Sequence, residues 1–305
     1  MSDDEEELLA GSDDPPFDEN DTGADIILRS NDGEDFYIRS ALLTMASPFF
    51  ARLLLSLRSH YRGPRGLPII ELAEDGESLQ QLLLWCDPRA VPSWELDDIE
   101  LALKSAEKYE MIGTKRFIGE MLGKLKEYVE TEPLKLFAIA VRHRIPDLAL
   151  IAKETLHHPL DGREYVPQLG DISGAVLHRL QEYYFCCTRT AIEVVERLEW
   201  EQRPFIWFEG PLVPCLCEYE VGQNHARRSK WWGDYMQRAK TALRLRPRGR
   251  TVLNLPSEIA ASALELATLC LYCGGRAYAD LQRFNVSFSN EVENAVDAVV
   301  CEFDL

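Results

Sequence analysis

The 305-residue sequence lacks any apolar run near the roughly 18 residues that a membrane-spanning helix needs. Its first residues also lack the basic segment that opens a secretory signal. These absences predict an intracellular protein, in the cytoplasm or the nucleus. In such a protein we expect the eight cysteines to be free thiols or metal ligands rather than disulfides.

Motifs that build catalytic sites are missing as well. The sequence has no glycine-rich phosphate loop, no nucleophile elbow and no helical pair of zinc-binding histidines. His157 and His158 are adjacent, so their rings would point apart on a helix. We therefore expect a protein that is not an enzyme and that needs no cofactor.

Positive charge is absent from the first 25 residues, which contain eleven acids and no lysine or arginine. They account for −11 of the net charge of −18. Because so acidic a segment has little apolar surface to bury, we predict that residues 1–23 form a disordered tail. Its simpler role is that of a solubilising extension. The alternative is that it docks on a basic surface.

One basic segment exists, between His225 and Arg250. It contains nine lysines and arginines, opposed by Asp234 alone, and Trp231 and Trp232 lie among them. Basic residues interleaved with aromatics can bind nucleic acid through phosphate contacts and base stacking. We favour a solvated face or a partner for the acidic tail, and keep a nucleic-acid-binding regulator as an alternative.

The segment from residue 25 to residue 50 reads as two strands, a turn and two helix starts. Ile26 and Leu28 alternate along the first strand, and an Asn-Asp-Gly turn follows. In the second strand Phe36 and Ile38 alternate with polar residues, Tyr37 among them, which predicts one buried face. Ser47-Pro48 is a preferred N-cap followed by a preferred first helical residue, so the second helix is expected to begin there.

Periodicity and capping signals predict the remaining elements. Residues 67–72 read as a third strand, and the helix over 97–108 has Asp97 or Asp98 as its cap. Phe117 is expected to point inward from the next helix, and residues 172–200 are expected to be helical with a break near 186–188. Further helices are predicted at residues 78–86, 114–129, 134–143, 146–156, 256–273 and 290–303, the last with Asn290 and Glu293 as a capping box.

The ordered set of strand, turn, strand, two helices, third strand and amphipathic helices resembles a BTB/POZ domain. The segments that carry the resemblance are Ala46–Phe50 ("ASPFF"), Leu67–Leu72 ("LPIIEL") and Ser105–Met111 ("SAEKYEM"). The second half, with Trp231-Trp232 and Cys270-x-x-Cys273, is similar to that of BTB proteins from basidiomycete fungi. The resemblance implies an α+β fold: a BTB/POZ domain over residues 24–125, followed by a helical region over 126–305.

BTB/POZ domains are protein–protein interaction modules, so the resemblance implies a homodimer that binds a further, unidentified protein. The motif positions that it assigns to interaction are Asp25, Phe36, Arg39, Leu43, Ser47, Phe49 and Phe50. An alternative is a substrate adaptor of a cullin-type ubiquitin ligase. Such adaptors carry an acidic residue after the second helix, where this chain has Leu57-Arg58-Ser59.

Four cysteines in the second half form two close pairs, Cys215 with Cys217 and Cys270 with Cys273. The segment before Cys217 is apolar, so we expect it to pack against the helix that carries the second pair. Four thiolates could hold zinc in a tetrahedron. We favour buried, reduced thiols without a metal, because free cysteine commonly behaves as a small buried hydrophobe.

Overall fold

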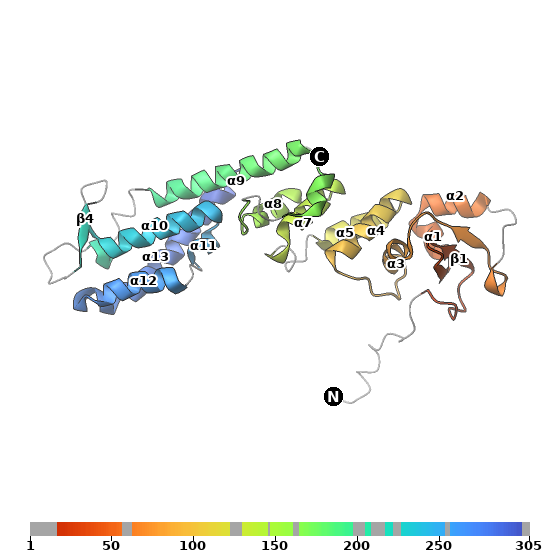
Figure 1. Cartoon of the computed structure of the whole chain (residues 1–305), viewed down its shortest axis with the longest axis horizontal. Coiled ribbons are helices and arrows are strands. Elements are labelled where there is room, and N and C mark those ends of the chain that lie inside the picture. Colours follow the sequence, from red (N-terminus) through yellow and green to blue (C-terminus); the bar gives the residue numbers. More distant parts are fainter. Residues whose placement is uncertain are drawn as a thin grey trace, which may run out of the picture. The chain divides into compact units, whose positions relative to one another are not determined.

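The computed structural model describes residues 17–56, 63–122, 130–145, 147–160, 165–197, 205–208, 217–221, 227–253 and 257–300 (Figure 1). The chain divides into two compact units. Unit 1 comprises Met1–Lys126 with His143–Pro146, and unit 2 comprises Glu127–Arg142 with Asp147–Leu305. The α+β class is confirmed, because unit 1 combines a small sheet with helices.

Unit 1 contains a three-stranded sheet in the order β2-β1-β3. β1 (Ile26–Arg29) pairs antiparallel with β2 (Asp35–Ile38) and parallel with β3 (Ile69–Glu71). The predicted turn between β1 and β2 is confirmed, and Gly33 adopts a φ of 92° there, which a residue without a Cβ does at little cost. The three predicted strands therefore form one sheet.

Five helices follow or cover these strands among the described residues of unit 1: α1 (Ser40–Ala46), α2 (Pro48–Ser56), α3 (Gly76–Leu84), α4 (Leu96–Lys108) and α5 (Ile112–Leu122). One face of the sheet, with Leu28 and Phe36, packs into the main core. The other face places Ile27 and Tyr37 in a second small cluster with Ile69. The prediction of a single buried face on β2 is therefore wrong, because Tyr37 is only 5% exposed.

Residues 17–23 are held to unit 1 at Phe17 and at Asp21. Phe17 belongs to the main core, and its carbonyl accepts a hydrogen bond from the Tyr37 N–H at 2.8 Å. The Arg89 guanidinium bridges Asp21 at 2.9 Å and Asp87 at 2.6 Å. The prediction of disorder over 1–23 is therefore wrong for residues 17–23, because apolar burial and ion pairs hold them. Residues 1–16 lie outside the described part.

Two local expectations in the helices of unit 1 are also wrong. α4 has Glu95 as its N-cap residue, so Asp97 and Asp98 lie in the first turn, where negative charge favours the positive end of the helix dipole. Phe117, which the sequence predicts to point inward, is 52% exposed, with its ring centroid 6.1 Å from that of Trp85. The stripe of α5 that is buried contains Ile118 and Leu122.

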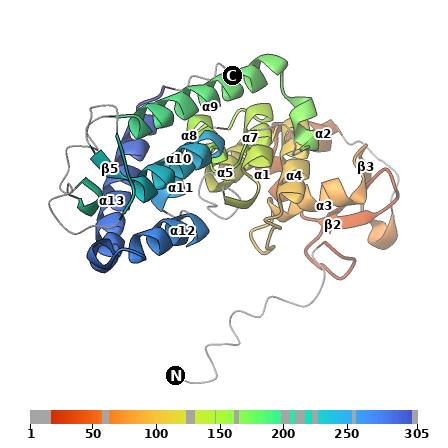
Figure 2. The same cartoon turned by 60° about the vertical axis from the view of Figure 1, so that its left-hand side comes forward.

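Unit 2 is mainly helical, as predicted for the second half. Its described helices are α7 (Pro133–Arg142), α8 (Leu148–Thr155), α9 (Gly174–Val195), α10 (Lys230–Leu245), α11 (Gly249–Leu253), α12 (Ser257–Thr268) and α13 (Leu271–Asp297), with 3-10 turns η2 (Pro167–Asp171) and η4 (Ile206–Phe208). α9 lies beside both α10 and α13 (Figures 1 and 2). A short antiparallel pair, β4 (Tyr219–Val221) and β5 (Arg227–Ser229), precedes α10. Among the helices described here, none is long and apolar enough to cross a membrane.

Aromatic rings fill the core of unit 2. Trp207 and Trp232 stack with their ring centroids 5.8 Å apart, and both side chains are almost completely buried. Phe284 of α13 meets both indoles edge-on, at 5.6 Å and 5.9 Å. These contacts bring η4, α10 and α13 together around one apolar centre.

The helix boundaries in unit 2 differ from the prediction in three places. α9 continues without the break predicted near 186–188, because Cys187 and Ala191 are buried along it and packing outweighs weak local propensity. The helix predicted over 256–273 is two helices, with the break after Thr268. The predicted start at Asn290 lies inside α13, and Glu293 instead accepts a hydrogen bond from the Gly249 N–H at 2.7 Å.

Candidate functional site

Two of the predicted interaction positions in unit 1, Asp25 and Arg39, lie at the start of α1. The Asp25 carboxylate accepts hydrogen bonds from the Ser40 N–H at 2.6 Å and from the Ser40 hydroxyl at 2.7 Å. Asp25 thus caps α1 from the residue that precedes β1. The exposed Arg39 side chain lies 3.8 Å from the Asp21 carboxylate. Both residues hold the start of α1 in place, and both remain exposed to solvent.

Ser47 joins the start of α2 to the end of α4. Its Oγ accepts a hydrogen bond from the Phe50 N–H at 3.0 Å, the N-cap interaction predicted from the sequence. The same hydroxyl donates to the Tyr109 carbonyl oxygen at 2.5 Å. Ser47 is fully buried, so it acts inside unit 1 rather than at its surface.

The aromatic and aliphatic positions of the predicted motif lie mainly in the core. Phe36, Leu43 and Phe50 are at most 4% exposed and belong to the main core of unit 1. Phe49 is half-buried against that core, with its ring centroid 5.2 Å from that of Tyr109. These residues determine which sides of α1 and α2 face outward.

The outward sides of α1 and α2 carry large apolar side chains that are not among the predicted interaction positions. Met45 on α1 and Leu55 on α2 are each 86% exposed. Ala41 and Pro48 are exposed on the same two helices, which pack against each other. We call these four residues the α1–α2 surface. Helical spacing from the core residues Leu43 and Phe50 is the signal that could have identified it. Leu57-Arg58-Ser59, the position that bears on cullin binding, lies outside the described residues.

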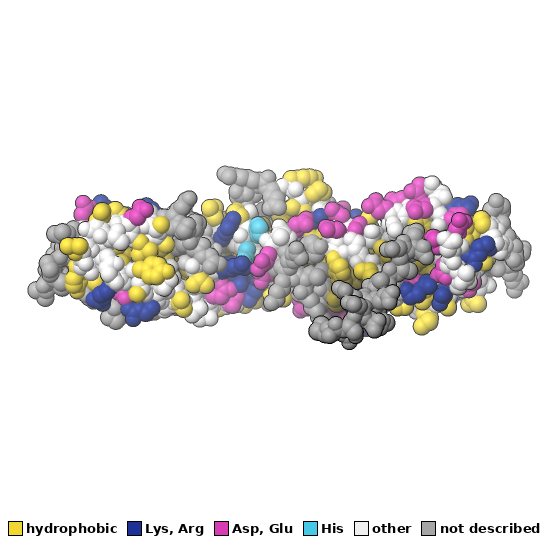
Figure 3. All heavy atoms as spheres, turned by 90° about the horizontal axis from the view of Figure 1, so that it is seen from below, with side chains coloured by type: hydrophobic (Ala, Val, Ile, Leu, Met, Phe, Trp, Pro, Cys, Tyr) yellow, Lys and Arg dark blue, Asp and Glu magenta, His cyan; other side chains and the backbone are white. Residues whose placement is uncertain are grey.

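The basic segment of unit 2 is extensively paired with acidic side chains. Arg228 lies 2.7 Å from Glu220, and Arg250 lies 3.0 Å from Glu130. Three further pairs are Lys230 with Glu218, Lys240 with Glu196, and Arg248 with Glu293. On the face seen in Figure 3, lysine and arginine side chains lie among aspartate and glutamate side chains.

The two tryptophans of this segment are not available for stacking on bases. Trp231 is 3% exposed and Trp232 is 1% exposed, and both rings pack against Trp207. The interleaving of aromatic and basic residues in the sequence therefore arises from one buried and one solvated side of α10. This is a packing pattern rather than a row of exposed rings.

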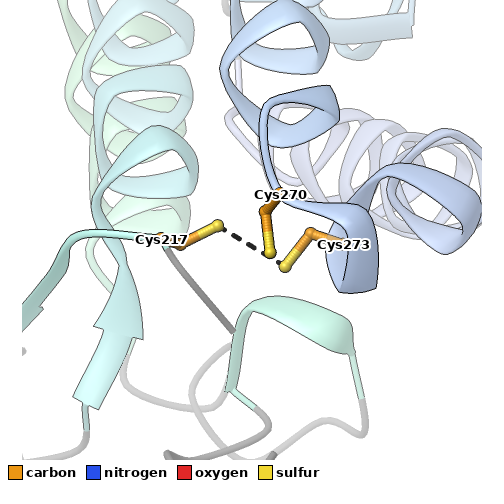
Figure 4. Close-up of side chains that lie close together, drawn as sticks. All are labelled: Cys217, Cys270 and Cys273. Carbon is orange, nitrogen blue, oxygen red and sulfur yellow. Dashed lines mark hydrogen bonds between the residues drawn. The ribbon is translucent and has the colours of Figure 1, made fainter. Parts of the chain in front are cut away.

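A cluster of three cysteine thiols lies in unit 2 (Figure 4). The sulfur atoms of Cys217, Cys270 and Cys273 all lie within 4.8 Å of one another, and those of Cys217 and Cys273 are 3.5 Å apart. Cys270 and Cys273 are buried, and Cys217 is half-buried. The predicted proximity is confirmed for these three residues, and Cys215 lies outside the described part.

The thiol cluster adjoins a cavity of about 280 Å³. Cys217 and Cys270 line it, together with Glu218, Lys230, Trp231, Asp234, Leu266 and Leu269. The Lys230 ammonium lies 2.9 Å from the Glu218 carboxylate. Soft sulfur donors, carboxylates and a cation thus share one small space.

Neither a scan against models of known protein families nor a search of curated proteins finds a match to this chain. Function is therefore inferred from the chain's own residues.

Proposed function

We propose that this chain is a non-enzymatic protein–protein interaction module of the BTB/POZ type, which forms a homodimer through the α1–α2 surface of unit 1. Residues 24–125 would be the BTB/POZ domain, and the helical region after them would serve a further protein partner. The observation that carries the proposal is the exposure of Met45 and Leu55, 86% each, on two consecutive helices.

The arrangement of elements supports the resemblance. An antiparallel hairpin leads directly into α1 and α2, and β3 then returns to pair parallel with β1. Asp25 and Ser47, two of the motif positions, cap these two helices. The two caps give a local structural role to two of the residues that carry the resemblance.

Burial of this surface in a two-fold interface would supply free energy of the same order as the cost of association. Burying one methionine or leucine side chain contributes about 1.5–3 kcal/mol. A two-fold interface buries each of them twice, so Met45 and Leu55 together would contribute about 6–12 kcal/mol before the cost of association, which is itself about 4–15 kcal/mol. The exposed Ala41 lies one helical turn before Met45 on α1, and the exposed Pro48 lies two turns before Leu55 on α2. A charge introduced at both large residues should therefore abolish the dimer.

Light scattering coupled to size exclusion on the full chain tests the proposal. At tens of micromolar the wild-type protein is expected at twice the 34.8 kDa mass of one chain. The Met45→Glu/Leu55→Glu variant is expected at the mass of one chain, with an unchanged circular dichroism spectrum. Val91→Glu is the matched control, because Val91 is 84% exposed in unit 1 but lies outside α1 and α2. A monomeric wild-type protein, or a dimeric double variant, would refute the proposal.

The two alternatives from the sequence have less support. A nucleic-acid role for the 225–250 segment is weakened by the burial of Trp231 and Trp232 and by the ion pairs of its basic residues. A cullin-type adaptor role depends on Leu57-Arg58-Ser59, which offers no acidic side chain. Retention on DNA at low salt, or co-purification of a cullin, would favour these alternatives.

A further inference from the structure

We propose that Cys217, Cys270 and Cys273 bind a zinc ion as thiolates, in a site that ties β4 to the junction of α12 and α13. This inference goes beyond the interaction module proposed above, because all three residues belong to unit 2. The sequence favours metal-free thiols, whereas the arrangement of the sulfur atoms favours the metal.

The spacing of the sulfur atoms fits one tetrahedral ion. Zinc–sulfur bonds of about 2.3 Å at tetrahedral angles place neighbouring sulfurs about 3.8 Å apart. The Cys217 and Cys273 sulfurs are 3.5 Å apart, and no pair in the cluster exceeds 4.8 Å. Small side-chain rotations therefore suffice to bring all three to one ion. A disulfide would join only two of them and leave the third thiol beside it.

The start of α13 holds two of the ligands in a fixed relation. Cys270 is the N-cap residue of α13, and Cys273 lies in the first turn, where the Gly274 N–H donates to the Cys270 carbonyl at 2.9 Å. The positive end of the helix dipole at this position stabilises thiolate anions. A Cβ at residue 274 would lie 3.3 Å from the Thr268 Cα, so glycine there allows α12 to end close to the start of α13.

Cys217 precedes a short strand pair that packs against α10 and η4. It lies two residues before β4, a three-residue strand in a two-stranded sheet. Two three-residue strands form few hydrogen bonds of their own, so the pair depends on contacts with its surroundings. The Lys230 N–H donates to the Glu218 carbonyl at 2.9 Å, which continues the strand pairing to the residue next to Cys217. A metal–sulfur bond from Cys217 would add a link from this end of β4 to α13, which makes the role of the ion structural.

The cavity beside the thiols provides room for a fourth ligand. A water molecule can enter it, whereas the carboxylates of Glu218 and Asp234, which also line it, do not belong to the group of ligand atoms within 4.8 Å of one another. Three thiolates and one zinc ion carry a net charge of −1, and the Lys230 ammonium lines the same space. Binding releases one proton from each of the three thiols, so zinc affinity should fall as the pH falls.

Elemental analysis of the full chain, purified under reducing conditions without chelator, tests the site. About one zinc per chain is expected. Cys217→Ser and Cys273→Ser should each lower the zinc content at least fivefold. Cys186→Ser is the matched control, because Cys186 is a half-buried free thiol of the same unit outside the cluster, and it should keep the wild-type zinc content.

A second measurement covers the case in which a serine variant misfolds. Wild-type protein stripped of zinc and loaded with cobalt should show the visible absorption of tetrahedral thiolate-bound cobalt, and the Cys217→Ser variant should lose it. Wild-type protein that takes up neither zinc nor cobalt under reducing conditions would overturn the proposal. So would a disulfide between Cys217 and Cys273, or a zinc content that Cys217→Ser and Cys273→Ser leave unchanged.

The oligomeric state separates this failure from a failure of the proposed function. The mass of the Cys217→Ser variant by light scattering should equal that of the wild type, because the substitution does not touch the α1–α2 surface. The Met45→Glu/Leu55→Glu variant should in turn keep its zinc.

Discussion

Replacing Ser47 by alanine should destabilise the packing of α2 in unit 1. The substitution removes a hydroxyl that makes two hydrogen bonds in a fully buried position. One bond caps α2 through the Phe50 N–H, and the other satisfies the Tyr109 carbonyl at the end of α4, 62 residues away in the sequence. Apart from the loss of this hydroxyl, the Ser47→Ala substitution changes neither the charge nor the shape of the side chain.

The expected magnitude follows from the two lost bonds. Loss of an N-cap serine costs about 1 kcal/mol. A buried carbonyl left without its donor costs about 1–3 kcal/mol more, because water does not reach it in the folded protein. The total of about 2–4 kcal/mol corresponds to a decrease of roughly 30- to 800-fold in the equilibrium constant between the packed and the locally unfolded states of α2.

Hydrogen exchange followed by mass spectrometry is the suitable assay, since a single melting temperature is ill-defined for a chain with two compact units. Peptides that cover α2 and the end of α4 should lose protection by that factor in Ser47→Ala. The matched control is Ser56→Ala, which removes an exposed hydroxyl bound to the Leu53 carbonyl at 2.7 Å and should change protection less than threefold. A Ser47→Ala protein within threefold of the wild type would refute this account of the cap.

Two further predictions concern ionisable groups. The hydrogen bond from Arg89 is the main reason why the pKa of Asp87 is lowered below its ordinary value of 3.8. The ion pair therefore stabilises the folded protein above pH 3.8, and this stabilisation is lost as the pH falls through the lowered pKa of Asp87 in the folded state. In the wild type, proteolysis within residues 17–23 should therefore begin only in acid below pH 3.8. The Arg89→Ala variant should be cut there already at pH 7, because it lacks the bridge between Asp21 and Asp87. Equal resistance of the wild type and the variant at pH 7 would contradict that bridge. Burial raises the pKa of Cys86 to about 12 and that of Cys187 to about 11, so at pH 8 both thiols should alkylate at least tenfold more slowly than in denaturant, as peptide mapping can measure.

Periodicity in the sequence was a good guide where one face of a helix is buried by the sheet. The spacing of Leu79, Leu82 and Leu83 predicts the buried side of α3, and all three are fully buried. Apolar side chains at such spacing have few alternatives, because the opposite side of the helix is polar. The same reasoning located the second helix from Ser47-Pro48, where a cap and a first helical residue act within two positions.

Local signals failed where tertiary contacts reassign a residue. Asn290 and Glu293 have the spacing of a capping box, but the Glu293 carboxylate accepts the Gly249 N–H, and α13 runs through both residues. Gly274 and Gly275 each weaken a helix by about 1 kcal/mol, yet α13 passes through them too. Phe284 and Phe288, both completely buried, supply packing that outweighs this penalty.

The cysteine cluster was partly predictable for a similar reason. The apolar segment before Cys217 and the pair at Cys270 and Cys273 predict that these cysteines lie close together, and Cys217 does lie beside that pair. Nothing in the sequence placed the end of one helix and the start of the next between residues 268 and 271. That junction makes Cys270 a cap residue and gives the three sulfur atoms their spacing. The spacing that fits a metal ion therefore could not be predicted from the sequence.

The predicted interaction motif and the surface that we propose to use are connected through the helix starts. Asp25 fixes the first turn of α1, and Ser47 fixes the first turn of α2. With those turns fixed, Leu43 and Phe50 can only point into the core, and helical geometry then directs Met45 and Leu55 to solvent. The motif residues therefore determine a surface that they do not themselves form. It follows that Ser47→Ala should weaken self-association only as far as it opens α2, whereas Met45→Glu/Leu55→Glu should abolish it in a folded protein.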